Sequence, residues 1–232
     1  MSYTYSSLIA ALQIEAVQLA SDPNWTGILP TIINDSEQRC YRDLDLVSCI
    51  VKDSSASLTA NSRNFTLPQS LGYFMTVKGM NVVIAGTPSQ LRPVSIHFID
   101  ATWPSDTSVA GTTPQYFAYL SDQNYLIAPS PSTTYGMQVF GTIRPTPLSA
   151  SNTTTYLTSY LSDLFFAGCM CSAAGYMRDY GSQADDPKLA ISWEMQYQQR
   201  LASANKEEMR RKYQSGDWTS ETRPNPVALP GQ

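Results

Sequence analysis

Charge is scarce in this chain, and histidine is almost absent from it. Only 15% of the 232 residues are Asp, Glu, Lys or Arg, against about 25% in an average globular protein. The net charge is −4 and the isoelectric point is near 4.9. A nucleic-acid-binding protein that neutralises phosphates needs a basic stripe, which this composition does not favour. We therefore expect no specific binding of DNA or RNA.

Motifs of catalysis and cofactor binding are also missing. The single histidine, His97, falls in an alternating apolar run that predicts a strand over residues 94–99, with His97 on the partly exposed face. No G-x-S-x-G turn, Walker loop, dinucleotide-binding glycine pattern or zinc knuckle occurs. Two pairs of aspartates lie at predicted helix ends, where Asp186 is explained as a cap: Asp43 with Asp45, and Asp185 with Asp186. The sequence predicts no enzyme, no cofactor and no metal site.

Cysteine spacing and hydropathy exclude several further classes. Four cysteines occur without a disulfide-framework or zinc spacing, and we expect buried thiols in a reducing cytoplasm: Cys40, Cys49, Cys169 and Cys171. The first 22 residues show no basic region or cleavage pattern of a secretory signal. No run approaches the roughly 18 apolar residues of a membrane span, so we expect no membrane contact.

What is present begins with helical periodicity. Apolar residues recur at helical spacing over residues 3–20, and the pattern stops at Asp22 and Pro23, where a helix is expected to end. Pro30 can occupy the first position of a second helix, because its missing N–H would be unsatisfied there in any case. The second helix is predicted over residues 30–45, with Glu37 among the apolar residues of its stripe.

The middle of the chain changes to short apolar runs separated by Gly, Pro, Asn and Ser. Such runs predict strands. Eight are present, at residues 48–52, 64–67, 73–78, 81–85, 94–99, 115–120, 125–128 and 136–144. Because no helical segment is predicted between them, they favour an antiparallel sheet or a small sandwich.

Helical periodicity returns after Pro147. Ser149 or Asn152 can cap a helix that reaches about residue 176, and its apolar circumference predicts a buried, central position. Asp186 and Pro187 can start a further helix that runs to about residue 214, where Gly216 ends it. The last stretch, residues 216–232, contains three prolines and no periodicity, which is typical of an extended arm.

Together these segments predict an α+β fold: a discontinuous four-helix bundle with an inserted antiparallel β module and an extended C-terminal arm. The bundle is divided between residues 1–46 and 146–215. The β module takes residues 47–145, and the arm takes residues 216–232.

Two groups of residues are candidates for contact with other proteins. One is a basic run, which the simpler interpretation treats as a solvated helix face with i,i+4 pairs between Glu207 and Arg211 and between Glu208 and Lys212. Its members are Arg200, Lys206, Arg210, Arg211 and Lys212. The other group lies in the arm and consists of Trp218, Arg223, Val227 and Leu229. Aromatic and apolar anchors in a proline-stiffened segment are suited to docking in a groove.

Several segments resemble the adaptor (connector) proteins of short-tailed phages. Residues 29–39, LPTIINDSEQR, are similar to that family's second helix, with its Leu-Pro start and its Glu-x-Arg pattern. Further similarity lies at residues 124–131, 135–139, 147–154 and 160–165. The matches keep the family's order and span most of residues 3–180.

The resemblance implies a structural virion protein at the head-tail junction, assembled in the host cytoplasm. Such adaptors form a homo-oligomeric ring, commonly of twelve copies, that binds below the portal protein and forms part of the channel for genome ejection. The arm would dock onto the portal, the β module would face tail nozzle or fibre proteins, and DNA would pass without specific binding. The alternatives are another neck or tail component, such as a head-closure protein, a tail-associated binding module, and a tail-associated cell-wall hydrolase.

Overall fold

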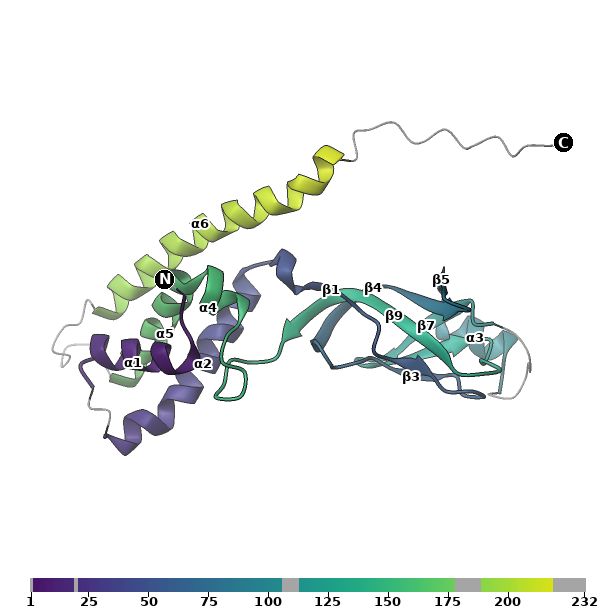
Figure 1. The fold of residues 1–232 in the computed structure, drawn as a ribbon, viewed down its shortest axis with the longest axis horizontal. Coiled ribbons are helices and arrows are strands. Elements are labelled where there is room, and N and C mark those ends of the chain that lie inside the picture. Colours follow the sequence, from purple (N-terminus) through teal and green to yellow (C-terminus); the bar gives the residue numbers. More distant parts are fainter. Residues whose placement is uncertain (1, 19–20, 106–112, 178–188, 219–232) are drawn as a thin grey trace. The chain divides into compact units, whose positions relative to one another are not determined.

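The chain has a mixed α+β fold with six α-helices among the described residues (Figure 1). The computed structural model describes residues 2–18, 21–105, 113–177 and 189–218. The chain divides into two compact units, of which the first combines Met1–Val47 with Pro147–Gln232 and the second is Ser48–Thr146. The first unit is helical, and the second is built mainly from strands.

Helix α1 spans Tyr5–Glu15 and is shorter than the periodicity predicted. Its start is fixed by a capping box, in which the Thr4 hydroxyl accepts the Ser7 N–H and the Ser7 hydroxyl accepts the Thr4 N–H. Leu8 and Leu12 are completely buried and set the inward face. The helix ends early because Val17 adopts a positive φ of 52°, which interrupts the helical backbone.

Helix α2 spans Pro23–Asp43, so the predicted start at Pro30 is wrong. The Asp22 carboxylate accepts the Asn24 N–H and Pro23 occupies the first turn, which makes this proline the helix start. Pro30 lies inside the helix, where it removes one backbone hydrogen bond. The first turns persist because Trp25 and Leu29 are buried, and this burial offsets the cost of the proline.

The predicted third helix is two helices, α4 over Tyr156–Tyr160 and α5 over Ser162–Met177. The backbone leaves the helical region at Leu161, between them. Neither predicted cap is used: Ser149 and Asn152 bond to each other in a turn, and Thr155 caps α4. The predicted burial is confirmed for α5, which packs against α1, α2, α4 and α6.

Helix α6 spans Leu189–Trp218 and packs along α5. Its predicted end near Gln214 is wrong, because the helix continues through Gly216 for about one further turn. A glycine inside a helix costs only about 1 kcal/mol, so it does not by itself end one. The predicted cap, Asp186 with Pro187, lies outside the described residues.

In its described residues, the β unit consists mainly of two sheets and one α-helix. The first sheet is antiparallel, with order β1-β9-β4-β5 and β2 also paired to β9. Its strands are β1 (Ile50–Asp53), β2 (Ser57–Leu58), β4 (Gly72–Ile84), β5 (Thr87–Gln90) and β9 (Tyr135–Pro145). The second sheet has order β3-β8-β7-β6, and its β6–β7 pair is parallel. Its strands are β3 (Asn64–Thr66), β6 (Arg92–Pro93), β7 (Tyr116–Ser121) and β8 (Asn124–Ala128).

One of the apolar clusters in the β unit joins the two sheets. Phe74, Met80 and Val139 from the first sheet and Phe65 and Ile127 from the second belong to one buried cluster. The arrangement agrees with the sandwich that the short apolar runs indicated.

One predicted strand is wrong, and two others prove to be parts of one strand. Residues 96–102 form helix α3 (Ile96–Thr102), because the Ser95 hydroxyl accepts the Phe98 N–H and caps a helix there. His97 therefore lies in the first turn of a helix. The two strands predicted on either side of Gly79 are one long strand, β4, which pairs with β9 on both sides of two register shifts.

Candidate functional site

Helix α6 carries the predicted basic run, and its two faces differ. Tyr197, Ala204 and Glu208 lie on the inward face and are buried. Met209 and Tyr213 lie on the opposite face, where they are 58% and 72% exposed. An apolar side chain left this open on an otherwise anchored helix is a candidate contact with another molecule.

The inward face is anchored to α2 by a cluster of charged and aromatic side chains. Arg39 donates two hydrogen bonds to the Glu194 carboxylate, at 2.5 and 2.9 Å. The Arg39 guanidinium also lies 4.0 Å from the centre of the Tyr197 ring. Tyr197 donates its hydroxyl proton to Asp43 at 2.7 Å. The bidentate geometry and the stacked ring fix α6 against α2 more firmly than a single surface ion pair would.

This cluster shifts the pKa values of its members. The hydrogen bonds from Arg39 lower the pKa of Glu194 to about 2. Burial raises the pKa of the Tyr197 phenol above its ordinary value, and the neighbouring Cys40 and Asp43 add to the rise. Glu194 therefore stays ionised and Tyr197 stays neutral throughout the physiological pH range.

Replacing Glu194 with glutamine is expected to lower the free energy of unfolding by about 1 kcal/mol at neutral pH, because the pair with Arg39 is partly exposed. A carboxyl with a lowered folded-state pKa contributes stability above its ordinary value of 4.5, and this contribution is lost as pH falls toward about 2. The difference between Glu194→Gln and the parent should therefore shrink over that window in urea titrations. The exposed Glu15 provides the control, since Glu15→Gln should change little. A pH-independent difference would contradict the assignment.

Glu37 forms a second connection, which links α2 to the segment that precedes α4 through a hydrogen bond. Its carboxylate is buried and accepts the backbone N–H of Leu148 at 2.9 Å. The Tyr41 hydroxyl approaches the other oxygen at 3.5 Å. Burial raises the pKa of Glu37, while these hydrogen bonds oppose the rise. The Glu-x-Arg pattern of residues 37–39 thus links α2 to two distant segments.

Glu208 forms the third connection, near the middle of α6. Its carboxylate is buried and accepts the N–H of Val47 at 2.9 Å, the Tyr156 hydroxyl at 3.1 Å and the Arg211 guanidinium at 2.6 Å. Desolvation raises the pKa of Tyr156 to about 12, with a further contribution from Glu208. Three donors compensate the burial of this charge.

The predicted basic run divides into anchoring and exposed members. Arg200 donates to the Asp163 carbonyl at 2.7 Å, and Lys212 pairs with Asp45. Arg211 pairs with Glu208 at i,i+3, where the sequence had predicted Glu207 as its partner.

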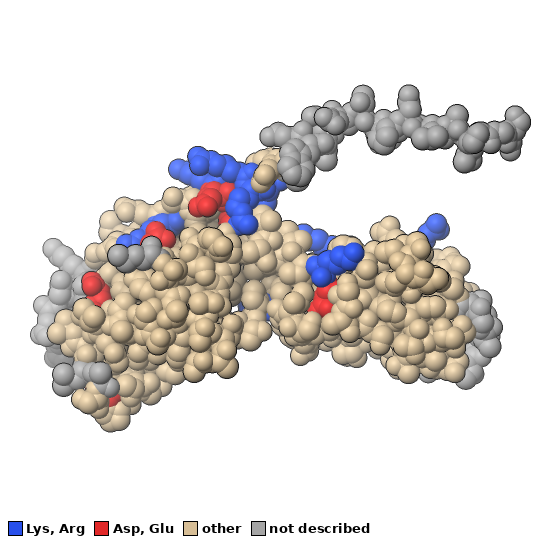
Figure 2. Space-filling model, in the orientation of Figure 1, with Lys and Arg blue, Asp and Glu red and all other residues tan. Residues whose placement is uncertain are grey.

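Lys206 and Arg210 are exposed, and neither pairs with a carboxylate in the described part of the chain. Figure 2 shows that basic side chains gather over the C-terminal half of α6, with carboxylates between them. Two cations on this half of the helix are therefore accessible to a partner.

The candidate arm residues lie mostly outside the described part of the chain. Trp218 is the last residue of α6. Arg223, Val227 and Leu229 fall in residues 219–232, which the structure does not describe.

Of the residues considered for catalysis, Asp43 and Asp45 lie in the helical unit and His97 lies in the β unit, while Asp185 and Asp186 fall outside the described residues. His97 is exposed on α3. Among the described residues, no group of three or more His, Cys, Asp or Glu is placed to hold a metal ion. None of the four cysteines is bonded in a disulfide, and burial raises the pKa of Cys40 to about 12 and that of Cys171 to about 11. Thiols with raised pKa values are poor nucleophiles at neutral pH. None of the described helices is both long enough and apolar enough to cross a membrane.

Sequence reasoning missed the anchoring roles of Glu37, Arg39 and Glu208. One signal was available, because Glu37 occupies a position on the apolar stripe of its helix, where an unpaired carboxylate would be costly. The identity of its partner, the Leu148 N–H, carries no such signal, since any backbone group can donate.

No curated protein matches the chain. A family model described as SU10 adaptor protein matches residues 3–225, which is nearly the whole chain, and it confirms the resemblance noted in the sequence. The chain belongs to the SU10 adaptor protein family, a family of phage adaptors.

Proposed function

We propose that this protein forms the adaptor ring of a short-tailed phage, bound below the portal protein and joining the capsid to the tail. In this proposal the ring contains about twelve copies, contacts nozzle or fibre proteins, and forms part of the channel through which the genome is ejected. It is a structural subunit and performs no catalysis. Family membership supports the adaptor role, and the two-faced α6 supports self-association.

The proposal of a ring depends mainly on one observation, a stripe of residues on the outward face of α6. We call it the α6 stripe. Its members recur at alternating spacings of four and three residues, and all are exposed: Met195, Gln199, Ala202, Lys206, Met209 and Tyr213. This is the spacing at which one helix packs along another. The inward face is already occupied, so the α6 stripe is free to contact the neighbouring copy.

The proposal also gives each domain a role. Residues 1–46 and 146–215 form the discontinuous four-helix bundle, with α1, α2, α5 and α6 as its long helices and α4 as a short lead-in to α5. This bundle makes the ring. The β module, residues 47–145, faces the tail, and the arm, residues 216–232, docks onto the portal with Lys206 and Arg210 beside it.

Charge is consistent with a channel through which DNA must move. The chain has a net charge of −4, and several of the basic residues on α6 are paired within the subunit. A ring of acidic subunits repels phosphates weakly, so DNA can pass without being held.

Replacing Met209 with glutamate tests the α6 stripe. We expect the isolated subunit to be largely monomeric and the ring to form on purified portal, because the stripe is only partly apolar. Met209→Glu should reduce ring formation on the portal about tenfold, since each subunit would bury a charge at the contact.

The matched control is Ser203→Glu, which adds the same charge to an exposed position of α6 outside the stripe. Negative-stain images and native mass spectrometry of portal mixtures report ring number and occupancy. Equal ring formation by both variants and the parent would exclude the α6 stripe as the contact. Failure of the parent to bind portal at all would overturn the adaptor proposal itself.

A further inference from the structure

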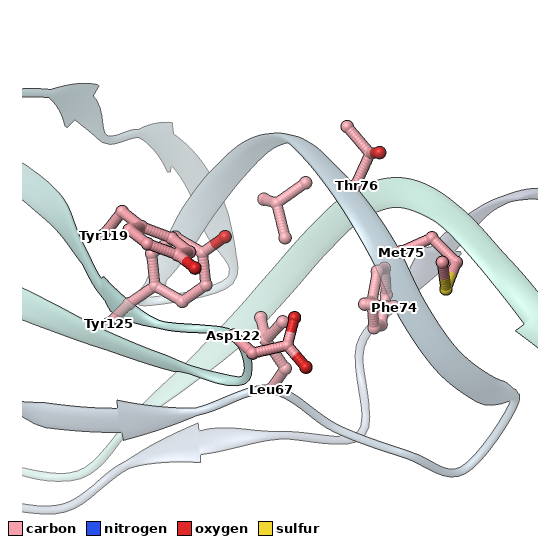
Figure 3. A pocket seen from close by; sticks show the side chains of 8 residues that line it. Leu67, Phe74, Met75, Thr76, Tyr119, Asp122 and Tyr125 are labelled. Atoms are coloured by element: carbon pink, nitrogen blue, oxygen red, sulfur yellow. The ribbon is translucent and has the colours of Figure 1, made fainter.

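A pocket of about 260 Å³ lies in the β unit, between strand β4 and the turn that joins β7 to β8. Figure 3 shows the rings of Tyr119 and Tyr125 on one side of the pocket, Phe74 and Met75 on the other, and the Asp122 carboxylate between them. Its volume is below the roughly 300–1,000 Å³ of typical small-molecule sites. The space is suited to one side chain of a partner.

Irregular strand pairing produces this pocket. The register of β4 against β9 shifts between Phe74 and Thr76, and that of β7 against β8 shifts between Tyr119 and Ser121. Such bulges redirect side chains and leave a local opening between strands. Gly141, on β9, permits the close approach, because a Cβ there would lie only 2.2 Å from the Thr76 carbonyl oxygen.

The turn that holds Asp122 is fixed to its surroundings. Tyr73 donates its hydroxyl proton to Asp122, and the Gln123 side chain donates to the Phe74 carbonyl at 3.0 Å. The Leu67 N–H donates to the Gln123 carbonyl at 2.9 Å. The pocket wall is therefore preorganised, which reduces the cost of ordering it around a ligand.

The chemistry of the lining favours a cation. Asp122 is exposed, and no Lys or Arg of the described residues pairs with it. Tyr119 is 60% exposed and stands edge to face against Tyr125, with ring centres 5.7 Å apart. An aromatic wall next to a carboxylate attracts a guanidinium through both ring and charge, and apolar residues can receive its aliphatic stem.

We propose that this pocket, bounded by Tyr119, Asp122 and Phe74, binds an arginine side chain presented by a neighbouring protein of the virion. Arginine fits better than lysine, because its planar guanidinium can stack on a tyrosine ring while it bonds the carboxylate. The inference rests on the proposed function only for the source of the arginine. The recognition chemistry stands without it.

Titration of the full chain with the peptide acetyl-Gly-Gly-Arg-Gly-Gly-amide, followed by NMR, tests the pocket. We expect millimolar binding that perturbs the resonances of Tyr119, Asp122 and Met75. The same peptide with citrulline in place of arginine has nearly the same shape without the charge, and it should bind at least fivefold more weakly.

Variants separate the charge from the fold. Asp122→Asn keeps an acceptor for Tyr73 and removes the charge, and it should weaken binding of the arginine peptide about fivefold. Asp35→Asn makes the same change of net charge at an exposed position of α2 and should leave binding unaltered. Tyr119→Ala removes the aromatic wall and should also weaken binding.

The outcomes are distinct from those of the ring experiment, because the titration needs no portal. Equal binding of the arginine and citrulline peptides, or no perturbation up to tens of millimolar, would overturn the proposal. An effect of Asp35→Asn as large as that of Asp122→Asn would do the same, since it would show attraction by overall charge alone.

Discussion

Replacing Tyr197 with alanine is expected to lower the free energy of unfolding by about 4 kcal/mol, the loss typical of a large aromatic side chain in a core. Tyr197 is completely buried, with Arg39 stacked on its ring. An ideal Cβ on Gly168 of α5 would lie only 3.4 Å from the same ring, so the two helices meet closely there. Removing the ring leaves a cavity between helices and deprives Arg39 of its support.

The hydroxyl and the ring of Tyr197 make separate contributions to the free energy of unfolding. Tyr197→Phe keeps the ring and removes only the hydrogen bond to the partly exposed Asp43, so we expect a loss of about 1 kcal/mol. Tyr213→Ala deletes the same side chain from an exposed position of the same helix, and it should stay within about 0.5 kcal/mol of the parent.

Urea unfolding followed by far-UV circular dichroism measures these differences, because the helical unit dominates that signal. A loss below about 1.5 kcal/mol for Tyr197→Ala, or one equal to that of Tyr213→Ala, would show that α6 does not depend on this anchor. The anchor also bears on function, since the proposed α6 stripe needs a helix that is held in place.

Truncation after Trp218 is expected to weaken binding to the portal at least about a hundredfold, or about 2.7 kcal/mol, while both units stay folded. Residues 219–232 contain Val227 and Leu229 among three prolines, which is typical of a segment that gains its contacts from a partner. Because α6 continues to Trp218, this truncation removes residues 219–232 of the arm without shortening the helix. Truncation after Gln214 would remove the last turn as well.

Substitutions at residues 218–229 identify which side chains of the arm contact the portal. Trp218→Ala should cost about 2 kcal/mol of portal affinity if Trp218 is a hot spot. Val227→Ser together with Leu229→Ser tests the apolar anchors of the arm, and Thr222→Ala is the matched control in the same segment. Arg223→Ala tests whether charge contributes.

Binding of each variant to immobilised portal, with circular dichroism of the same samples, decides the role of the arm. Equal affinity of the truncated and complete chains, both folded, would assign the portal contact to the bundle or to the β module. The exposed pair Lys206 and Arg210 on α6 would then be the next candidates.

Local patterns in the sequence were sufficient to predict whether most segments form a helix or a strand. Apolar spacing predicted the helices that became α1, α2, α5 and α6, because each has a stripe that must be buried whatever it packs against. Short β-rich runs predicted most strands of the β unit for the same reason. The apolar circumference of residues 162–177 also indicated the central position of α5.

Boundaries were less predictable, because a cap or a proline has more than one possible role. Pro30 is compatible with a first helical turn, yet it lies inside α2 since the burial of Trp25 extends the helix. The run at residues 94–99 alternates like a strand, but the Ser95 cap allows a helix that buries Ile99. In both places the choice depends on which side chains find a core to enter.

Composition and spacing established a protein with few charges, no catalytic motif, two helical segments of chain around a β module, and an adaptor-like order of motifs. The residues that anchor α6 and the pocket of the β unit depend on tertiary packing, and local sequence did not predict them. Arg39 and Glu194 are 155 positions apart, and Glu37 and Leu148 are 111 apart. Residues this far apart in the sequence leave no helical or strand periodicity from which the pairing could be predicted. Partners so distant meet only when the helices pack together, and a buried carboxylate such as Glu37 must then find a hydrogen-bond donor among the groups that packing brings near it.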